Sequence, residues 1–327
     1  MRDVITCSCL SANVDVDYVR DADGTIPPEA FIALRDRCPV LKKILIPDEI
    51  WQKFLQWHQH PDDIASHASV VLLAFIRGVV PRITVPIHRY VMTGDYIAPS
   101  ATRQYVTDLR ETWMLHADPS TRNRLCRTFR GRLIELQFAA WLEDHGHFIV
   151  GMEGIRQGPD IETISYAGQT AFEVKFFGQA DEDSLVLLDA MHNGPSGGAV
   201  SLPEPINYLL FRVYEAARQL RPAKGQKTAI IVIDEMGWHR FDMQLNHDWI
   251  DWANPQFLGV PCEWERLLSL QKQGTGLPAD LGATIRELDT LQIFRQNHAF
   301  VFRPEKEITF NGHTLDRACS ACSGSCQ

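Results

Sequence analysis

From residue 120 onward, the hydrophobic positions recur first with the period of an amphipathic α-helix and then with that of β-strands. The helical stripe stops before Gly146, a residue type that commonly follows the last turn of a helix. The next segment, HFIVG, is short and apolar, and it predicts a strand. The stripe consists of Leu125, Phe129, Leu133, Leu136 and Ala140.

Two segments after this strand predict a β-hairpin. GPDIETISY and QTAFEVKFF are β-prone runs joined across Ala167-Gly168, which is a turn signal. Side chains alternate between the two faces of a strand, so Val174 points to one face while Glu173 and Lys175 share the other. The sequence therefore predicts that a carboxylate and an ammonium group lie on the same side of the sheet.

A second helix and a buried strand complete this pattern. Apolar positions between Ile206 and Leu220 have helical spacing and stop before Pro222. TAIIVID follows as an unbroken apolar run, which is typical of a strand covered on both faces. These elements predict an α/β fold with a mixed sheet flanked by helices on both sides. Residues 237–318 are harder to interpret, although AFVFRP and EITF are candidates for a late pair of strands.

The N-terminal part of the chain has a different pattern. It is interrupted by prolines and contains segments such as PDEIWQKFLQWHQ, in which Ile50, Phe54 and Trp57 recur at helical spacing. Helix-start signals near Asp118 mark the boundary with the part that follows. We predict a mainly helical region over residues 1–117, which selects a substrate or a partner protein or forms a homodimer. Residues 118–327 would form the α/β domain with a C-terminal extension.

The composition excludes several classes of protein. With 327 residues, of which 45% are hydrophobic and 22% charged, the chain is typical of a folded globular protein. The best membrane candidate, SVVLLAFIRGVV, is too short to span a bilayer, and the N-terminus lacks an apolar stretch of signal-peptide length. We therefore expect a cytoplasmic protein without a membrane partner. Because the net charge is −9, contact with a polyanion requires a local basic surface.

The charged residues of the predicted hairpin suggest metal-dependent chemistry. Asp160 begins the first strand and is expected to meet Glu173 across the hairpin. Two carboxylates and a backbone carbonyl are the oxygen ligands that Mg²⁺ prefers, and Lys175 is placed to orient or deprotonate a water molecule. Glu162 lies on the same strand face as Asp160 and is a candidate auxiliary ligand. The alternative is a structural ion pair on an exposed sheet face, since about one acid-x-Lys triplet is expected by chance.

The order of these elements and charges resembles a known enzyme family. A Pro-Asp pair before one hairpin strand and a Glu-Val-Lys triplet in the other follow a helix that carries an acid. This arrangement resembles the PD-(D/E)xK nuclease superfamily, whose core is the restriction-endonuclease-like fold. The resemblance covers residues 120–235 and includes a later helix that carries a glutamine. The matching residues are Glu135, Pro159, Asp160, Glu173, Val174, Lys175 and Gln219.

The resemblance implies a site and an activity. Asp160, Glu173 and the Val174 carbonyl would bind Mg²⁺ or Mn²⁺, Lys175 would act on the attacking water, and Glu135 would assist through a second metal or a bound water. Gln219 joins them as a candidate catalytic residue. The implied activity is endonucleolytic hydrolysis of nucleic acid in restriction, repair or defence. DNA is favoured over RNA, although no short signature separates the two. The alternatives are a nucleic-acid-binding or scaffolding module without catalysis and an enzyme that acts on another substrate.

Five arginines lie within eleven residues of the predicted helix, just before Glu135. Such a cluster provides the local basic surface that phosphate contact requires in an otherwise acidic protein. The alternative is a solvated helix face with acidic neighbours. The five are Arg122, Arg124, Arg127, Arg130 and Arg132.

Cysteines gather at both ends of the chain. Cys7 and Cys9 lie near its start, and Cys319, Cys322 and Cys326 near its end, with spacings that allow several thiolates to bind one Zn²⁺ or an iron-sulfur cluster. Some nucleases of the superfamily hold a cluster with a C-terminal cysteine trio, and this layout is similar. The alternative is a frayed Ser/Gly-rich tail without a metal.

Overall fold

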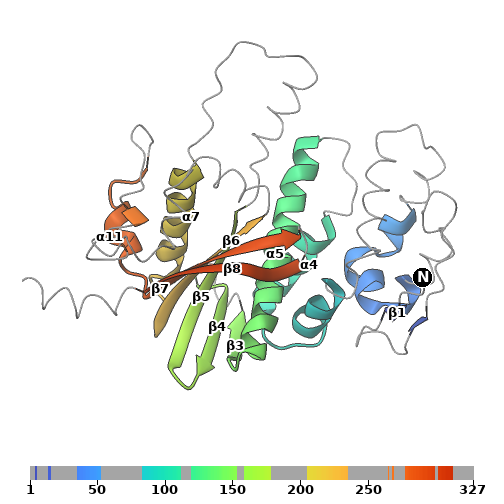
Figure 1. Ribbon diagram of the computed structural model, residues 1–327. Coiled ribbons are helices and arrows are strands. Elements are labelled where there is room, and N and C mark those ends of the chain that lie inside the picture. Colours follow the sequence, from blue (N-terminus) through green and yellow to red (C-terminus); the bar gives the residue numbers. More distant parts are fainter. Residues whose placement is uncertain are drawn as a thin grey trace, which may run out of the picture. The chain divides into compact units, whose positions relative to one another are not determined.

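The structure is a computed structural model in which two compact units can be described, Met1–Trp141 and Leu142–Gln327 (Figure 1). The boundary between them lies within one long helix, α5 (Pro119–Asp144), whereas the boundary expected from the sequence, at residues 117 and 118, precedes that helix. The described residues are 4–5, 14–15, 35–52, 83–111, 119–152, 158–177, 205–234, 264, 267–268, 277–298 and 301–311.

The described residues of the first unit are mainly helical. They include two π-helices, η1 (Leu41–Leu45) and η2 (His88–Met92), the helix α4 (Pro99–Glu111) and most of α5. Two short strands, β1 (Val4–Ile5) and β2 (Val14–Asp15), pair antiparallel. Arg110 joins α4 to η1, because its Nη2 donates to the carbonyl oxygen of Lys43 at 3.0 Å.

The end of α5 confirms the predicted helix stop at Gly146. The Gly146 amide donates to the carbonyl of Glu143, and the His147 amide donates to that of Leu142. Gly146 has a φ of 84°, a left-handed conformation that glycine adopts without steric cost. This turn leads the chain directly from the helix into the first strand of the second unit.

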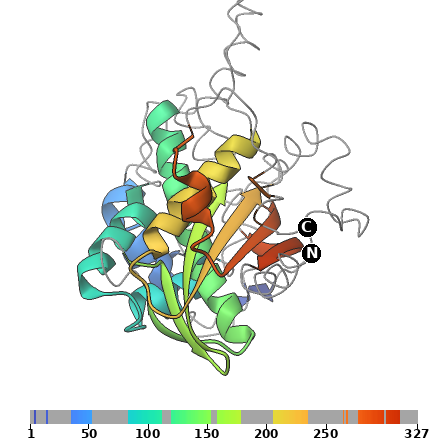
Figure 2. The same cartoon turned by 90° about the vertical axis from the view of Figure 1, so that its left-hand side faces the viewer.

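The second unit is built on a six-stranded mixed sheet in the order β3-β4-β5-β6-β7-β8 (Figures 1 and 2). The three strands β5, β6 and β7 are parallel to one another, and the remaining neighbours pair antiparallel. An α/β fold with a mixed sheet is therefore present. The strands are β3 (Phe148–Met152), β4 (Ile161–Ser165), β5 (Gly168–Phe177), β6 (Gln226–Asp234), β7 (Thr290–His298) and β8 (Val301–Asn311).

The predicted hairpin corresponds to β4 and β5, with its turn one residue earlier than expected. Tyr166 and Ala167 form the turn, while Gly168 begins β5 with a φ of 117°. A loop of two residues fixes the strand register, in which Ser165 pairs with Gly168 and Ile161 pairs with Phe172.

Two helices of the second unit, α7 (Pro205–Leu220) and α11 (Leu281–Ile285), pack on the same face of the sheet (Figure 2). The apolar stripe of α7 that the sequence predicted forms the centre of this core with β5 and β6. The opposite face carries Phe172, Val174 and Ile230, which are buried as well. The core under α7 includes Ala171, Leu209, Leu210, Val213, Ala217, Leu220, Ala229, Ile231, Ile233, Leu291 and Ile293.

The late strands differ from the expectation. AFVFRP and EITF do not form two paired strands; the described backbone places most of both segments in one strand, β8. Its partner is β7, whose sequence TLQIFRQNH the pattern analysis did not identify. Polar residues interrupt the apolar positions of β7, which explains why its periodicity is weak.

Among the helices that the structure describes, none combines the length and the apolar character needed to cross a bilayer.

Candidate active site

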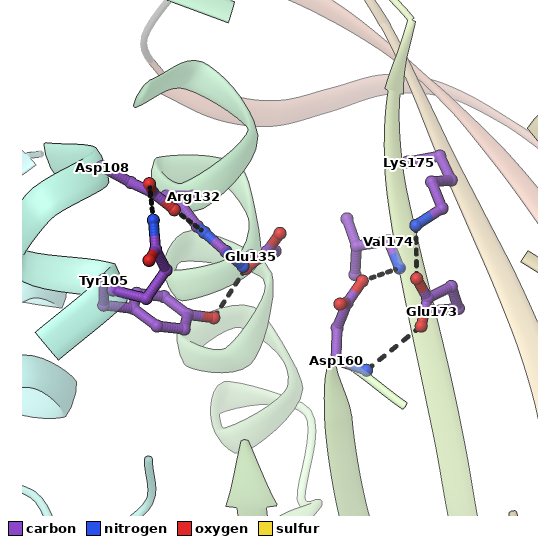
Figure 3. A network of polar contacts seen from close by, with 9 residues as sticks. Tyr105, Asp108, Arg132, Glu135, Asp160, Glu173, Val174 and Lys175 are labelled. Atoms are coloured by element: carbon purple, nitrogen blue, oxygen red, sulfur yellow. Dashed lines mark hydrogen bonds and ion pairs between the residues drawn. The ribbon is translucent and has the colours of Figure 1, made fainter. Parts of the chain in front are cut away.

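The hairpin register brings the two predicted carboxylates together. β4 begins at Ile161, which pairs with Phe172 of β5. One step further along the same register, Asp160 stands opposite Glu173, and directly opposed residues project to the same face of an antiparallel pair. The amide of Asp160 donates to Oε2 of Glu173 at 3.3 Å (Figure 3). The convergence expected from the sequence is therefore present.

Two further contacts tie the site together. The Val174 amide donates to Oδ2 of Asp160 at 2.8 Å. The Lys175 ammonium group donates to Oε1 of Glu173, to which it is also ion-paired. Each carboxylate thus accepts a hydrogen bond from the neighbouring strand segment, and the lysine lies against the acid two residues before it (Figure 3).

Glu173 is fully buried, with 0% of its surface exposed, and Asp160 is 7% exposed. Glu173 alternates with Ala171, which belongs to the apolar core under α7, so the two residues share the face that α7 covers. The alternative predicted an ion pair on an exposed face of the sheet. The ion pair is present, but its face is not exposed, because only 18% of the Lys175 side chain is accessible. Burying two carboxylates is costly unless they are paired and hydrogen-bonded, which these are.

The direction of the Val174 carbonyl, the third predicted ligand, follows from the extended geometry of β5. The amide and the carbonyl of one residue in an extended strand point to the same side of that strand. Because the Val174 amide reaches Asp160, its carbonyl is also directed toward the side of β4. The ladder between β4 and β5 ends at Phe172, so Val174 lies where β5 continues beyond its paired neighbour.

Glu162 follows the same alternation. It pairs with Ala171, so its side chain shares the face of Asp160 and Glu173, as the sequence predicted. Glu162 is partly exposed, and its role as an auxiliary ligand stays a prediction.

Glu135 belongs to the first unit, where it takes part in a polar network between α4 and α5. Its Oε2 accepts hydrogen bonds from the Tyr105 hydroxyl at 2.6 Å and from Nη1 of Arg132 at 3.0 Å. Nε of Arg132 donates to Asp108 at 2.9 Å, and Gln104 donates to the other oxygen of Asp108 (Figure 3). These bonds give Glu135 a structural role in its own unit. Its catalytic role stays a prediction.

The predicted arginine cluster does not form one face. α5 is continuous through this segment, and successive residues of a helix are separated by about 100°. The five positions are therefore distributed around the whole circumference of α5, with neighbouring positions about 60–80° apart. Arg132 is held by Asp108 and Glu135, whereas Arg124 is exposed. The side chains of Arg122 and Arg127 lie outside the described residues, and phosphate contact by the cluster stays a prediction.

Gln219 lies in the last turn of α7. Directly after this helix, the carbonyl of Arg221 accepts a hydrogen bond from Lys227, which pairs with Ala171. The end of α7 is therefore beside the first half of β5, and Gln219 lies closer to Ala171 than to Lys175. Its assignment to the catalytic residues stays a prediction.

The middle of α7 carries an arginine that the sequence analysis did not select. Arg212 donates to the Tyr208 hydroxyl from Nε at 3.0 Å and from Nη2 at 2.6 Å, and its Nη1 donates to Glu215 at 2.7 Å. The spacing of these three residues, four and then three apart, is the signal that would have identified a polar stripe beside the apolar one.

The predicted metal site at the chain ends lies outside the described residues, which include none of Cys7, Cys9, Cys319, Cys322 and Cys326. Within the described part, no cluster of three or more His, Cys, Asp or Glu side chains is arranged to hold a metal ion. The terminal cysteine site therefore stays a prediction.

His147, in the turn before β3, makes the stability of the second unit dependent on pH. Its Nδ1 lies 3.2 Å from the Thr163 hydroxyl and its ring packs edge-on against Phe172. Burial, together with the nearby His145, holds the pKa of His147 below its usual range. The unfolded chain therefore binds a proton at higher pH than the folded one. Stability should fall as the pH decreases from about 7 through the ordinary histidine value of about 6.5.

The measurement for this prediction is urea unfolding at pH 7.5 and pH 5.5. His147→Gln removes the titrating group, so the variant should lose less stability than the wild type between these two values. His145→Gln is the comparison, because it removes the smaller of the two causes and keeps the His147 ring, so its pH dependence should lie between those of the wild type and His147→Gln. An equal pH dependence in His147→Gln and the wild type would contradict the assignment.

Comparison of this chain with protein-family models, with curated proteins and with solved structures gave no match.

Proposed function

We propose that this protein is a metal-dependent nuclease of the PD-(D/E)xK type, which hydrolyses phosphodiester bonds of nucleic acid, with DNA as the favoured substrate. One observation carries the proposal. Asp160 and Glu173 are in contact at the start of β4, at the point where β5 extends beyond its pairing with β4, and Lys175 is bonded to Glu173. The order of α5, the β4–β5 hairpin, α7 and β6 supports the finer proposal of a restriction-endonuclease-like core.

The residues at this point fit a Mg²⁺ or Mn²⁺ ion. Asp160 and Glu173 supply hard carboxylate oxygens, and the Val174 carbonyl is directed toward the same edge. An ionised carboxylate offers about four lone-pair positions, so its hydrogen bonds here are compatible with metal ligation. The three side chains carry two negative charges and one positive charge, and a divalent cation would offset the excess. When bound, the ion would polarise the phosphodiester and acidify a water molecule.

The roles of the chain's own residues follow from their contacts. Glu173 holds the Lys175 ammonium group at the site through its Oε1. Lys175 has three N–H donors, so it can bond to Glu173 and at the same time orient the attacking water or a phosphate oxygen. The Val174 amide fixes the orientation of Asp160. These groups lie on a strand and at a strand start, which are rigid supports for a site.

The competing function is a nucleic-acid-binding or scaffolding module without catalysis. The ion pair between Lys175 and Glu173 is compatible with this function, since a lysine that only neutralises a buried carboxylate needs no catalytic role. The two functions differ in one result. The catalytic protein cleaves a substrate only when a divalent metal is present, whereas the module binds without cleavage.

We expect wild-type protein to cleave at least one of four labelled substrates, single-stranded or duplex DNA or RNA, in Mg²⁺ or Mn²⁺ and not in EDTA. Asp160→Asn should lower the cleavage rate at least about 100-fold, because it removes a charged ligand of the metal. Glu162→Gln is the matched control, since it is an equivalent change on the same strand face and is expected to have a smaller effect. Equal cleavage by the wild type and Asp160→Asn, or cleavage in EDTA, would contradict the proposal.

A further inference from the structure

The β3–β4 end of the sheet exposes apolar side chains on a folded surface. Phe148 is 70% exposed and Ile164, its direct partner across the two strands, is 50% exposed. Tyr166 is fully exposed at the tip of the hairpin. We call these three residues the hairpin patch. Large exposed apolar side chains that lie together mark sites of interaction more often than isolated ones do.

The hairpin patch and the carboxylate pair lie on the same face of the sheet. Ile164 alternates with Glu162 and Asp160 along β4, and these residues oppose the positions of β5 that share a face with Glu173. Four residues of strand separate Ile164 from Asp160, which corresponds to about 13 Å. This distance corresponds to about four stacked nucleotides of a nucleic-acid strand.

Arg212 lies on the flank of α7 that faces away from α11. Tyr214 bonds to Asp280 just before α11, which identifies the other flank. The helical period places Arg212 and Tyr208 about opposite Tyr214 on the helix surface. Arg212 precedes the end of α7 by eight residues, or about 12 Å. This length equals about four residues of strand and places Arg212 near the level of Lys175. Lys175 and Arg212 are thus two cationic groups on this side, and each is already ion-paired, with Glu173 and with Glu215.

We propose that this face binds single-stranded nucleic acid, with bases stacked on Phe148 and Tyr166 and the backbone directed past Arg212 toward Lys175. The inference rests on the proposed function for its chemistry and adds the substrate class. Every base of a single strand offers an aromatic face, whereas a duplex hides these faces inside its stack. A second protein copy fits less well, because the hairpin patch exposes roughly 400 Å² and a stable interface takes about 800 Å² from each partner.

The test is binding in EDTA, where a metal-dependent enzyme does not consume its ligand. Fluorescence anisotropy would compare a labelled 20-nucleotide single strand with the matched duplex. Phe148→Ala should weaken binding to the single strand about tenfold, because one stacking partner is lost, and should leave duplex binding within about twofold. Phe211→Ala is the matched control, since Phe211 is an exposed phenylalanine that lies on α7 and outside the hairpin patch. It should leave both affinities unchanged.

Three results would overturn the inference. They are no binding of the single strand by the wild type, an equal loss in Phe148→Ala and Phe211→Ala, and a wild-type dimer that Phe148→Ala converts to a monomer in light scattering. The last result would assign the hairpin patch to a protein interface. Thermal unfolding of both variants would verify that they are folded.

The two proposals can fail separately. If the wild type cleaves and Phe148→Ala binds the single strand normally, the nuclease remains and the stacking surface is wrong. If Phe148→Ala alone loses binding to the single strand and no substrate is cleaved, the surface remains and the nuclease is wrong.

Discussion

Replacing Lys175 with methionine is expected to lower metal-dependent cleavage at least about 100-fold, the lower end of what a positioned proton-transfer group contributes. Methionine keeps the unbranched side chain out to the ε position and removes the ammonium group that is bonded to Glu173. The variant therefore loses the group that we propose orients the attacking water, while most of the packing remains. The measurement is single-turnover cleavage of the preferred substrate by the folded fraction of each protein.

A loss of stability must be separated from a loss of chemistry in this variant. Removing Lys175 leaves the fully buried carboxylate of Glu173 without this cation, which typically costs about 3 kcal/mol. The matched control is the double variant Glu173→Gln/Lys175→Met, in which both charges are removed together. We expect it to unfold at a urea concentration closer to that of the wild type and to remain inactive.

The Lys175 prediction has a clear contrary outcome. If Lys175→Met is less stable but cleaves within about tenfold of the wild type, Lys175 serves only as a partner for the buried Glu173. Lys175→Arg provides a further comparison, because it keeps the charge and changes the geometry of the donors. Recovery of stability without recovery of cleavage would support the catalytic role.

The convergence of Asp160 and Glu173 was predictable because it depends on local rules. A short turn fixes the hairpin register, and the register fixes which residues face each other. Even with the turn one residue earlier than expected, both carboxylates remain on the same face. The helix end at Gly146 was predictable for the same reason, since a left-handed glycine after an apolar stripe is a local signal.

The burial of Glu173 was not predictable, because it depends on which face of β5 receives α7. The alternation in FEVKF indicated an apolar face and a charged face, but it did not indicate which helix would cover each face. In the structure both faces are covered, and α7 packs on the face of Ala171 and Glu173. The apolar stripe of α7 packs on β5 and β6, and residues such as Ile231 of β6 share this core although no local pattern connects them to Glu173.

The positions of the five arginines could not be predicted from their proximity in the sequence. Proximity in sequence suggested a common surface, but the helical period distributes these residues around α5. Asp108 of α4, the partner of Arg132, is 24 positions away in the chain. Ion pairs of this kind depend on how two helices pack, which composition and spacing do not determine. Arg212, by contrast, has its partners on its own helix, and a helical projection of α7 would have revealed them.

Gly225→Ala is expected to lower the free energy of unfolding of the second unit by about 4 kcal/mol. Gly225 has a φ of 77°, a left-handed conformation that costs an alanine about 1–2 kcal/mol. A Cβ atom there would also lie 2.3 Å from the carbonyl oxygen of Gln169, so the backbones of two neighbouring strands would have to separate. These strands carry the parallel register that sets Ala229 beside Glu173, so the substitution should also reduce activity. The measurement is urea unfolding monitored by circular dichroism.

Substitutions at two other glycines separate the effect of the positive φ from the effect of the close contact with Gln169. Gly168 also has a positive φ, of 117°, and no atom lies within 4 Å of the Cβ that Gly168→Ala would add, so conformational strain alone should cost about 1–3 kcal/mol. Gly131→Ala lies within α5 with open space around the added carbon and should stabilise the protein by about 0.5–1 kcal/mol. If Gly225→Ala is no more destabilising than Gly168→Ala, the close approach of Gly225 to Gln169 does not hold β6 in register, and the alignment beneath the candidate site must have another cause.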